Sequence, residues 1–202
     1  MKMGWLMGWA VPEAWFAPLV RRYFPAETHV FVPAGPEAIA QLHAAGPLDH
    51  VIGYSLGSQL LLAAAASGAS LGRVDLLVPI FAFPREEELG GRVARTQVRL
   101  LMRWLRSDPA AALADFYKRA GLDIAPAQAP VNELANLQWG LEQLESRRVE
   151  PPLPAGWRAW AGGADALLDA ARLVAVAPEI VIVPQATHHP AELLRALAEV
   201  KR

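Results

Sequence analysis

The 202-residue sequence contains no cysteine. This excludes disulfides, cysteine-based zinc sites and a cysteine nucleophile, and it is compatible with a reducing compartment such as the cytoplasm. Charge of one sign is not in excess either, because 19 Lys and Arg residues are balanced by 20 Asp and Glu residues. Without an overall basic field, nucleic acid is not expected as a partner.

Long apolar runs are also missing. The longest, LLLAAAASGAS at residues 60–70, is far shorter than the roughly 20 residues that a transmembrane helix needs. The apolar stretch at the N-terminus is interrupted by Gly4, Gly8 and Pro12 and no A-x-A cleavage site follows it, so we interpret it as a strand and its loop. We therefore expect a soluble cytoplasmic protein without a membrane partner.

Strand-like and helix-like segments alternate along most of the chain. The strand-like segments are residues 3–7, 28–33, 49–54, 74–83, 157–162 and 179–184. The amphipathic helical segments are residues 12–24, 35–46, 56–67, 165–176 and 189–202. This alternation predicts an α/β fold with a mostly parallel sheet flanked by helices on both faces.

The alternation stops at residues 84–150, where helical segments follow one another at 90–107, 108–121 and 130–146. Asp108 followed by Pro109 predicts the start of the second of these helices, and Gly121 predicts its end. We expect residues 84–150 to form an inserted helical cap, or lid. Residues 1–83 and 151–202 would then form the core.

The segment HVIGYSLGSQLLLAAAAS, residues 50–67, places a G-x-S-x-G motif between a buried strand and an Ala-rich helix. This setting is that of the nucleophile elbow of α/β-hydrolases, in which a sharp turn exposes the serine hydroxyl above the sheet. Gly53 and Gly57 lack the Cβ atoms that would clash in such a turn. The motif therefore predicts Ser55 as a nucleophile.

A serine nucleophile needs a base and a group that orients the base, and in this fold the order along the chain is Ser, acid, His. Asp165 follows a strand in a Gly-rich turn, although a helix N-cap is the alternative interpretation; Asp169 is expected at the surface. His188 follows the last strand, and we favour it over His189 as the base. The remaining histidines lack such a context and are not expected to be catalytic: His29, His43 and His50.

The oxyanion hole is expected to combine two backbone N–H groups. One is that of Leu56, directly after the nucleophile, and the other comes from the loop after the first strand, where Gly8 allows a turn and Trp9 supplies the N–H. For the Trp9 side chain, a structural role and a substrate-facing role both remain open.

Five segments together resemble the pimeloyl-[acyl-carrier protein] methyl ester carboxylesterases of biotin synthesis, the BioH-like group. They are MGWAVPEAWFAPL, GYSLGSQLLL, LLMRWLRSDPAAALADFYKRAGL, GGADALL and ATHHPAELLRAL, and the resemblance covers nearly the whole chain. It implies an α/β-hydrolase fold, no metal or organic cofactor, and acyl carrier protein as the partner. It also implies these roles: Ser55 as nucleophile, Asp165 as acid, His188 as base, and Trp9 and Leu56 as oxyanion donors. We further expect Trp9 and Tyr54 to contact the substrate.

The sequence departs from that family at three positions in these motifs. Met7 stands where these enzymes usually have His, Tyr54 where Trp is frequent, and Ser58 replaces a common glycine. We also expect the early antiparallel strands of larger hydrolases to be absent, because the sequence starts at the strand before the oxyanion loop. None of these departures removes a member of the Ser, His and Asp set.

An arginine series is the feature that points to an acidic partner. Its members recur at spacings of three and four, so on one helix they would lie within an arc of roughly 80°: Arg92, Arg95, Arg99, Arg103 and Arg106. A solvated helix face usually mixes both signs of charge, and this one does not. We therefore expect a docking strip for acyl carrier protein, with Arg95, Arg99 and Arg103 at its centre; an ordinary solvated surface is the alternative.

The function predicted on this basis is that of a serine carboxylesterase that hydrolyses the methyl ester of pimeloyl-acyl carrier protein. A carboxylesterase for small esters or thioesters is the alternative within enzymes. A protein of another class, which binds acyl groups or partners without catalysis, is the second alternative, and the complete Ser, His and Asp set argues against it.

Overall fold

The computed structural model describes residues 1–200 and contains a six-stranded sheet with the order β2-β1-β3-β4-β5-β6. Every neighbouring pair of strands is parallel. The strands are β1 (Lys2–Leu6), β2 (Thr28–Val32), β3 (His50–Tyr54), β4 (Val74–Leu77), β5 (Arg158–Gly162) and β6 (Val181–Val183). The predicted α/β class with a parallel sheet is confirmed.

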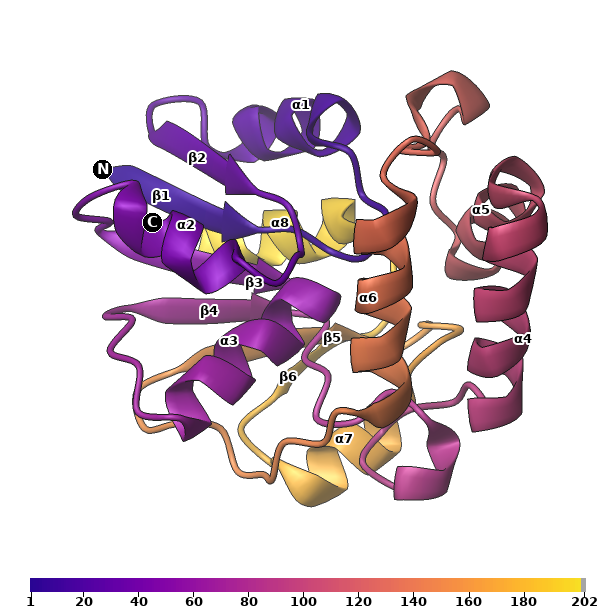
Figure 1. Ribbon diagram of the computed structural model, residues 1–202. Helices are drawn as coiled ribbons and strands as arrows, with labels where there is room; N and C mark the ends of the chain where they lie inside the picture. The colour runs from indigo at the N-terminus through magenta and orange to yellow at the C-terminus, as the bar shows by residue number, and fades with distance from the viewer. Residues whose placement is uncertain (201–202) are drawn as a thin grey trace.

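Helices cover both faces of the sheet (Figure 1). On one face α1 (Glu13–Tyr23) packs against α8 (Pro190–Glu199), and on the other α2 (Ala38–Ala44) packs against α3 (Leu56–Ala66). The central strands β3 and β4 are buried along their whole length, which explains why, apart from His50 and Asp75, they are apolar without a polar alternation. Within residues 1–200, no helix has the length and apolar character needed to cross a membrane.

The strand predicted over residues 74–83 ends at Leu77, so its length is corrected. Pairing with β5 ends at the contact of Leu77 with Trp160, and the next residue, Val78, has a positive φ of 57°. The chain therefore turns out of the sheet there, and the apolar residues that follow are buried in loops rather than in a strand.

Two predicted helices begin five residues later than expected. The helix predicted over 165–176 is α7 (Ala170–Val176), because residues 165–169 form a turn. The helix predicted over 90–107 is α4 (Arg95–Ser107), so Arg92 precedes the helix instead of lying on it.

The segment between β4 and β5 contains α4, α5 (Pro109–Ala120) and α6 (Leu134–Ser146), together with 3₁₀ turns at Arg85–Glu87 and Pro126–Gln128. The predicted ends of α5 are confirmed: the Asp108 carboxylate accepts a hydrogen bond from the backbone N–H of Ala111 at 3.0 Å, and Gly121 adopts φ 67°. Figure 1 shows these three helices gathered at one end of the sheet. We call them the cap helices, while the division of the chain at residues 84 and 150 stays a prediction.

The strand order reverses next to β1, and this reversal positions the site. From β1 the chain runs to β2 on one side, and it then returns to β3 on the other side of β1. In parallel α/β sheets such a reversal leaves a crevice outside the carboxyl ends of the two strands. The loops after β1 and β3 meet there, and the cap helices lie over this end of the sheet.

Candidate active site

Ser55 lies at a strained turn between β3 and α3, with φ 54° and ψ −118°. Such a conformation is unfavourable for a residue with a Cβ, and it persists only where the surroundings hold it. Both flanking glycines are required by close approaches. A Cβ on Gly57 would lie 2.0 Å from the carbonyl oxygen of Leu6, and one on Gly53 would lie 2.8 Å from the Cα of Ser58. The structure therefore gives the G-x-S-x-G motif the geometry of a nucleophile elbow.

Ser58, which departs from the glycine of the resembling family, supports the point where the chain leaves β4. Its Oγ accepts a hydrogen bond from the backbone N–H of Ile80 at 3.2 Å and lies 2.8 Å from the carbonyl oxygen of Val78. A glycine could make neither contact, so this serine ties the elbow to the chain that leads into the cap.

Ser55, His188 and Asp165 form a connected chain of side chains. The Oγ of Ser55 is 3.0 Å from Nε2 of His188, and Nδ1 of His188 is 2.9 Å from Oδ2 of Asp165. They follow β3, β6 and β5 respectively, and their exposed fractions are 8%, 2% and 1%. With Nδ1–H donating to the carboxylate, Nε2 is left to accept the serine proton.

Asp165 is held as an anion although it is buried. Burial by itself raises the pKa of a carboxyl group, but the charge and hydrogen bond of His188 and two backbone N–H groups lower it, so that the pKa lies below its usual value. Those donors are the N–H groups of Leu167 and Leu168, which reach Oδ1 at 2.7 and 3.1 Å. The carboxylate therefore contacts His188 and the turn that follows Asp165, and it does not serve as the N-cap of α7.

Asp169 and His189, which lie near Asp165 and His188 in the sequence, make contacts outside the Ser55 site. Asp169 is the N-cap of α7, where its carboxylate accepts from the backbone N–H of Ala171 at 3.1 Å. His189 points away from Ser55: its Nε2 is 3.2 Å from Oδ1 of Asp123, and its Nδ1 accepts from the N–H of Ala191. The structure thus brings His188, and not His189, to the serine.

The loop after β1 lies directly against the serine. An ideal Cβ built on Gly8 would be 3.2 Å from the Cβ of Ser55, so a larger residue would crowd the elbow. Within residues 1–200 the backbone N–H groups of Trp9 and Leu56 donate no hydrogen bond. Both amides therefore retain the donor capacity that an oxyanion hole requires.

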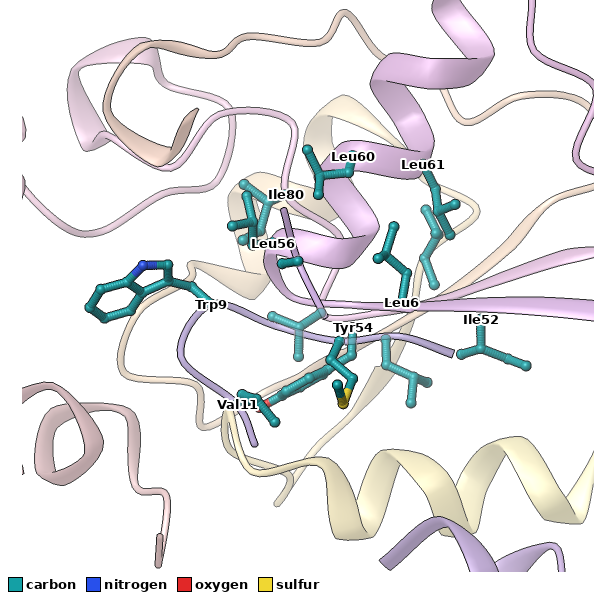
Figure 2. Close-up of a cluster of buried hydrophobic side chains, with 14 of the residues drawn as sticks. Leu6, Trp9, Val11, Ile52, Tyr54, Leu56, Leu60, Leu61 and Ile80 are labelled. Atoms are coloured by element: carbon teal, nitrogen blue, oxygen red, sulfur yellow. The ribbon is translucent and has the colours of Figure 1, made fainter. Parts of the chain in front are cut away.

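The Trp9 side chain packs between the loop after β1 and the cap helices, as its structural interpretation predicts. It is 3% exposed, its Nε1 donates to the carbonyl oxygen of Leu137 in α6 at 2.8 Å, and its ring meets Phe116 of α5 edge to face at 4.6 Å. Figure 2 shows the indole projecting from the loop, away from the strands. It joins the loop after β1 to the cap helices.

Tyr54 lies beneath the site, contrary to the expectation that it contacts substrate. Its side chain is 1% exposed, on the opposite side of the strands from Leu60 and Leu61 (Figure 2). The ring stacks on Phe16 at 5.5 Å, and the hydroxyl donates to the backbone carbonyl of His188 at 2.8 Å. Burial raises the pKa of this phenol well above its usual value, so it stays a neutral donor.

A cavity of about 480 Å³ lies between the cap helices and the turn after β5. Ala166 and Leu167 of its lining directly follow Asp165, so the cavity borders the acid turn; Phe116 of its lining contacts Trp9 and thus lies between the cavity and the loop after β1. Its walls are mainly apolar: Phe83, Arg92, Val93, Gln97, Val98, Leu100, Leu101, Trp104, Asp115, Phe116, Arg119, Leu141, Leu144, Ala166 and Leu167.

The arginine series is not the uniformly unpaired stripe that the sequence suggested. Arg95 is ion-paired with Glu87 and Glu145, and Nη2 of Arg99 is 2.7 Å from Glu145. Their partners come from the turn before α4 and from α6, so pairing within one helix could not reveal them.

The ends of the arginine series differ from its middle. Arg92, outside α4, donates to the backbone carbonyl of Asp165 at 2.9 Å and has its Nε 3.8 Å from Asp169. Arg103 and Arg106 have exposed side chains on α4, and no ion pair joins them to another side chain within residues 1–200. The free positive charge on α4 is therefore confined to its second half.

Metal-binding clusters are also missing from the described part of the chain. Residues 1–200 contain no group of three or more His, Cys, Asp or Glu side chains that could hold a metal ion.

Comparison with known proteins identifies the fold. No family model and no curated sequence matches the chain. Among solved structures, an esterase from Exiguobacterium antarcticum matches with a TM-score of 0.72 at 11% identity, covering 100% of this chain and 90% of that one. BioG from Haemophilus influenzae matches with a TM-score of 0.63 at 12% identity, covering 96% and 91%.

A third solved structure widens the range of activities among the matches. The type II thioesterase BorB from the borrelidin biosynthetic cluster matches with a TM-score of 0.61 at 13% identity, covering 99% of this chain and 90% of that one. At such identities a likeness establishes the fold. The protein has the α/β-hydrolase fold, as the sequence resemblance implied.

Proposed function

We propose that the protein is a serine hydrolase of carboxylic esters, with Ser55 as nucleophile, His188 as general base and Asp165 as the group that orients the base. The observation that carries this proposal is the chain of contacts from Ser55 Oγ through His188 to Asp165, built on a strained elbow beside two free backbone N–H groups. Nucleophile, base, orienting acid and oxyanion donors are the parts that acyl transfer to serine requires.

The geometry supports a two-step reaction. In the first step Ser55 Oγ bonds to the ester carbonyl carbon while its proton passes to Nε2 of His188. The oxyanion accepts hydrogen bonds from the N–H groups of Trp9 and Leu56, and the imidazolium is stabilised by Asp165. The carbon–oxygen bond to the alcohol then breaks, and His188 returns the proton to the leaving alcohol.

The second step restores the enzyme. Water gives a proton to His188 as its oxygen attacks the acyl carbon. The bond to Ser55 Oγ breaks, the serine regains its proton from His188, and the carboxylic acid leaves. The same side chains thus act twice, with no group consumed.

The apolar cavity is proposed as the acyl site. It borders the turn that holds Asp165, and Phe116 of its wall packs against Trp9, which supports it as the space for an acyl chain attached at Ser55. Its volume of about 480 Å³ is within the usual range of small-molecule sites. We expect Leu101→Trp, which fills the cavity, to raise KM for long-chain esters and leave hydrolysis of an acetate ester nearly unchanged.

The more specific proposal is that the substrate is the methyl ester of pimeloyl-acyl carrier protein, with methanol as the leaving alcohol. It is supported by the sequence resemblance to the BioH-like esterases and by the likeness to BioG. Arg103 and Arg106 offer an exposed positive surface beside the cavity for an acidic carrier. A chain without cysteine suits the cytoplasm, where we place this activity.

A general esterase or thioesterase for small substrates is the second candidate. The likeness to a type II thioesterase favours it, and the thioester carbonyl would be attacked by the same Ser55. Complementation of a biotin auxotroph that lacks its own esterase separates the two candidates, because only the carrier-specific esterase restores growth without added biotin.

The decisive test of catalysis is Ser55→Ala, assayed with p-nitrophenyl butyrate. Loss of the nucleophile is expected to lower kcat by about 10⁴ or more. Wild-type protein should also be labelled by a fluorophosphonate at Ser55, and the variant should not. Activity near the wild-type level in Ser55→Ala would overturn the hydrolase proposal and leave acyl binding without catalysis.

The carrier proposal is tested by reversing the free charges on α4. Arg103→Glu with Arg106→Glu should raise KM for the carrier-bound ester, because an encounter attraction becomes a repulsion, and should leave p-nitrophenyl butyrate unaffected. The matched control reverses Arg21 and Arg22, two exposed arginines on α1. Equal KM values for control and test variant on the carrier-bound ester would contradict carrier docking on α4.

A further inference from the structure

The cap helices hold the oxyanion loop from two sides. From α5, the Tyr117 hydroxyl donates to the backbone carbonyl of Ala10 at 2.7 Å. From α6, the carbonyl oxygen of Leu137 accepts the Trp9 Nε1–H at 2.8 Å. Consecutive residues of one catalytic loop are therefore fixed by helices far away in the sequence.

The loop needs such support because its backbone is strained. Ala10 has φ 56°, in the left-handed region that favours glycine and that a residue with a Cβ rarely adopts. Its own side chain offers no polar group that could hold this turn. The hydrogen bond from the Tyr117 hydroxyl to the Ala10 carbonyl therefore stabilises the strained backbone at Ala10 from outside the loop.

The packing leaves little room for another arrangement. Tyr117 is 3% exposed, so the loss of its hydroxyl would leave a carbonyl that water reaches poorly. A Cβ on Gly140 of α6 would lie 2.4 Å from Cδ1 of Trp9, which shows how closely α6 approaches the indole. The contact between loop and cap is therefore a tight one.

We propose that the cap sets the oxyanion hole: Tyr117, through Ala10, is a positioning residue that aims the backbone N–H of Trp9 at the substrate oxyanion. This inference rests on the proposed serine hydrolase function and deepens it. It assigns a catalytic consequence to a cap residue that contacts neither Ser55 nor His188.

The same contacts link the hole to the acyl site. Phe116, the residue before Tyr117, lines the cavity and meets Trp9 edge to face. An acyl chain in the cavity presses on the side chain that packs against the oxyanion loop. The backbone N–H of Trp9 would thus be more rigidly positioned when the cavity is occupied than when it is empty. Long-chain esters should therefore have a higher kcat, as well as a lower KM, than short-chain esters.

The test begins with Tyr117→Phe, which removes one oxygen and keeps the ring. We expect kcat for p-nitrophenyl butyrate to fall about tenfold with KM nearly unchanged, because a donor used in the transition state is displaced rather than lost. The matched control is Tyr23→Phe on α1, which should retain wild-type kcat. Binding of a trifluoromethyl ketone, whose adduct with Ser55 carries the oxyanion, should weaken in proportion to kcat.

A second substitution separates positioning from a general weakening of the cap. Glycine adopts a positive φ without the penalty of a Cβ, so Ala10→Gly should restore much of the kcat lost in Tyr117→Phe. A purely structural effect would lower the melting temperature and would not respond to Ala10→Gly in kcat. An unchanged kcat in Tyr117→Phe, or no recovery in the double variant, would overturn the inference.

Failure of the inference about Tyr117 can be distinguished from failure of the proposed hydrolase function. If Ser55→Ala abolishes activity while Tyr117→Phe leaves it intact, the hydrolase proposal stands and the role of the cap in the oxyanion hole falls. If Ser55→Ala is active, both fall together.

Discussion

Two buried pairs of histidine and aspartate lie at opposite edges of the same sheet. At the carboxyl edge, Nδ1 of His188 is 2.9 Å from Asp165. At the amino edge, Nε2 of His50 is 2.7 Å from Asp75, and both side chains are fully buried. The pairs are similar in residue type and burial, yet only one of them adjoins a serine at a strained elbow.

The third member of each cluster explains the difference. Asp75 also receives two hydrogen bonds from Arg158, at 2.7 and 2.6 Å, and that guanidinium lies over the Trp160 ring. A permanent cation neutralises the carboxylate there and offers no nucleophile. At the carboxyl edge the third member is the Ser55 hydroxyl, so the hydrogen-bonded chain ends in a group that can react.

An Asp–His pair is therefore no evidence of catalysis by itself. It becomes a candidate site through the hydroxyl, the free amides and the cavity around it. The same residue types serve the structure at the other edge, where they join the first residue of β3 (His50), the second of β4 (Asp75) and the first of β5 (Arg158).

The largest expected effect on kcat is that of replacing His188, and His50 provides the comparison. His188→Ala should lower kcat for p-nitrophenyl butyrate by about 10⁴ or more, because the serine loses its base. His50→Gln should leave kcat of the folded protein unchanged and lower the melting temperature. Steady-state kinetics and thermal unfolding of both variants check this.

The neighbouring histidine supplies the control for that experiment. His189→Ala should keep most of the activity, since His189 faces Asp123 rather than Ser55. A loss as large as that in His188→Ala would move the base to His189. A lower kcat in His50→Gln with an unchanged melting temperature would contradict the purely structural role of the amino-edge pair.

The aspartates should separate the two roles in the same way. Asp165→Asn is expected to cost about 10⁴ in kcat, because an amide favours the wrong imidazole tautomer. Asp75→Asn should instead destabilise the fold by about 1–3 kcal/mol, because the amide replaces a buried charged acceptor of the two Arg158 hydrogen bonds. Denaturant unfolding and kinetics of each purified variant measure both quantities, and equal unfolding free energies for wild type and Asp75→Asn would contradict the structural role.

Acid should reveal the amino-edge pair through stability. Burial raises the pKa of Asp75, but hydrogen bonds and charges from His50 and Arg158 together lower it by a larger amount. Its pKa in the folded protein therefore lies below the unfolded value of about 3.9. Its stabilisation is then complete above about pH 3.9 and is lost as the pH falls through the folded pKa. The unfolding free energy of wild type should therefore fall more steeply below about pH 4 than that of Asp75→Asn, and parallel pH curves would contradict the prediction.

The sequence revealed the parts of this protein whose signals are local. Strand-turn-helix patterns around Ser55 and the order of Ser, Asp and His along the chain predict both the fold and the cluster that the structure assembles. The end of α5 at Gly121 was likewise readable, because a helix cap is formed by neighbours in the sequence.

Contacts between segments that are distant along the chain could not be predicted from the sequence. The Arg95 and Arg99 side chains seemed unpaired because Glu145, their partner, lies on another helix. Nothing near Tyr117 in the sequence indicates that its hydroxyl meets Ala10. The end of β4 at Leu77 depends on where its neighbour β5 stops pairing, which a run of apolar residues cannot show.

The smallest expected effect comes from Tyr54→Phe, which loosens the carboxyl-edge pair without touching its side chains. The Tyr54 hydroxyl donates to the backbone carbonyl of His188, and the phenylalanine ring can keep the stacking on Phe16. A buried carbonyl left without its donor costs about 1–3 kcal/mol. Part of that loss would appear as freedom in the loop that carries the base, so kcat should fall by a few-fold at unchanged KM.

The temperature dependence of kcat decides what that loss means. If Tyr54 positions His188, the kcat deficit should persist well below the melting temperature of the variant, since the change affects the geometry of the folded site. The amino-edge pair provides the reference: Tyr54→Phe combined with Asp75→Asn should show the stability loss of Asp75→Asn and the kcat loss of Tyr54→Phe added together, because distant sites without shared partners act independently. A double variant with a much larger kcat loss would show that the two edges of the sheet are coupled after all.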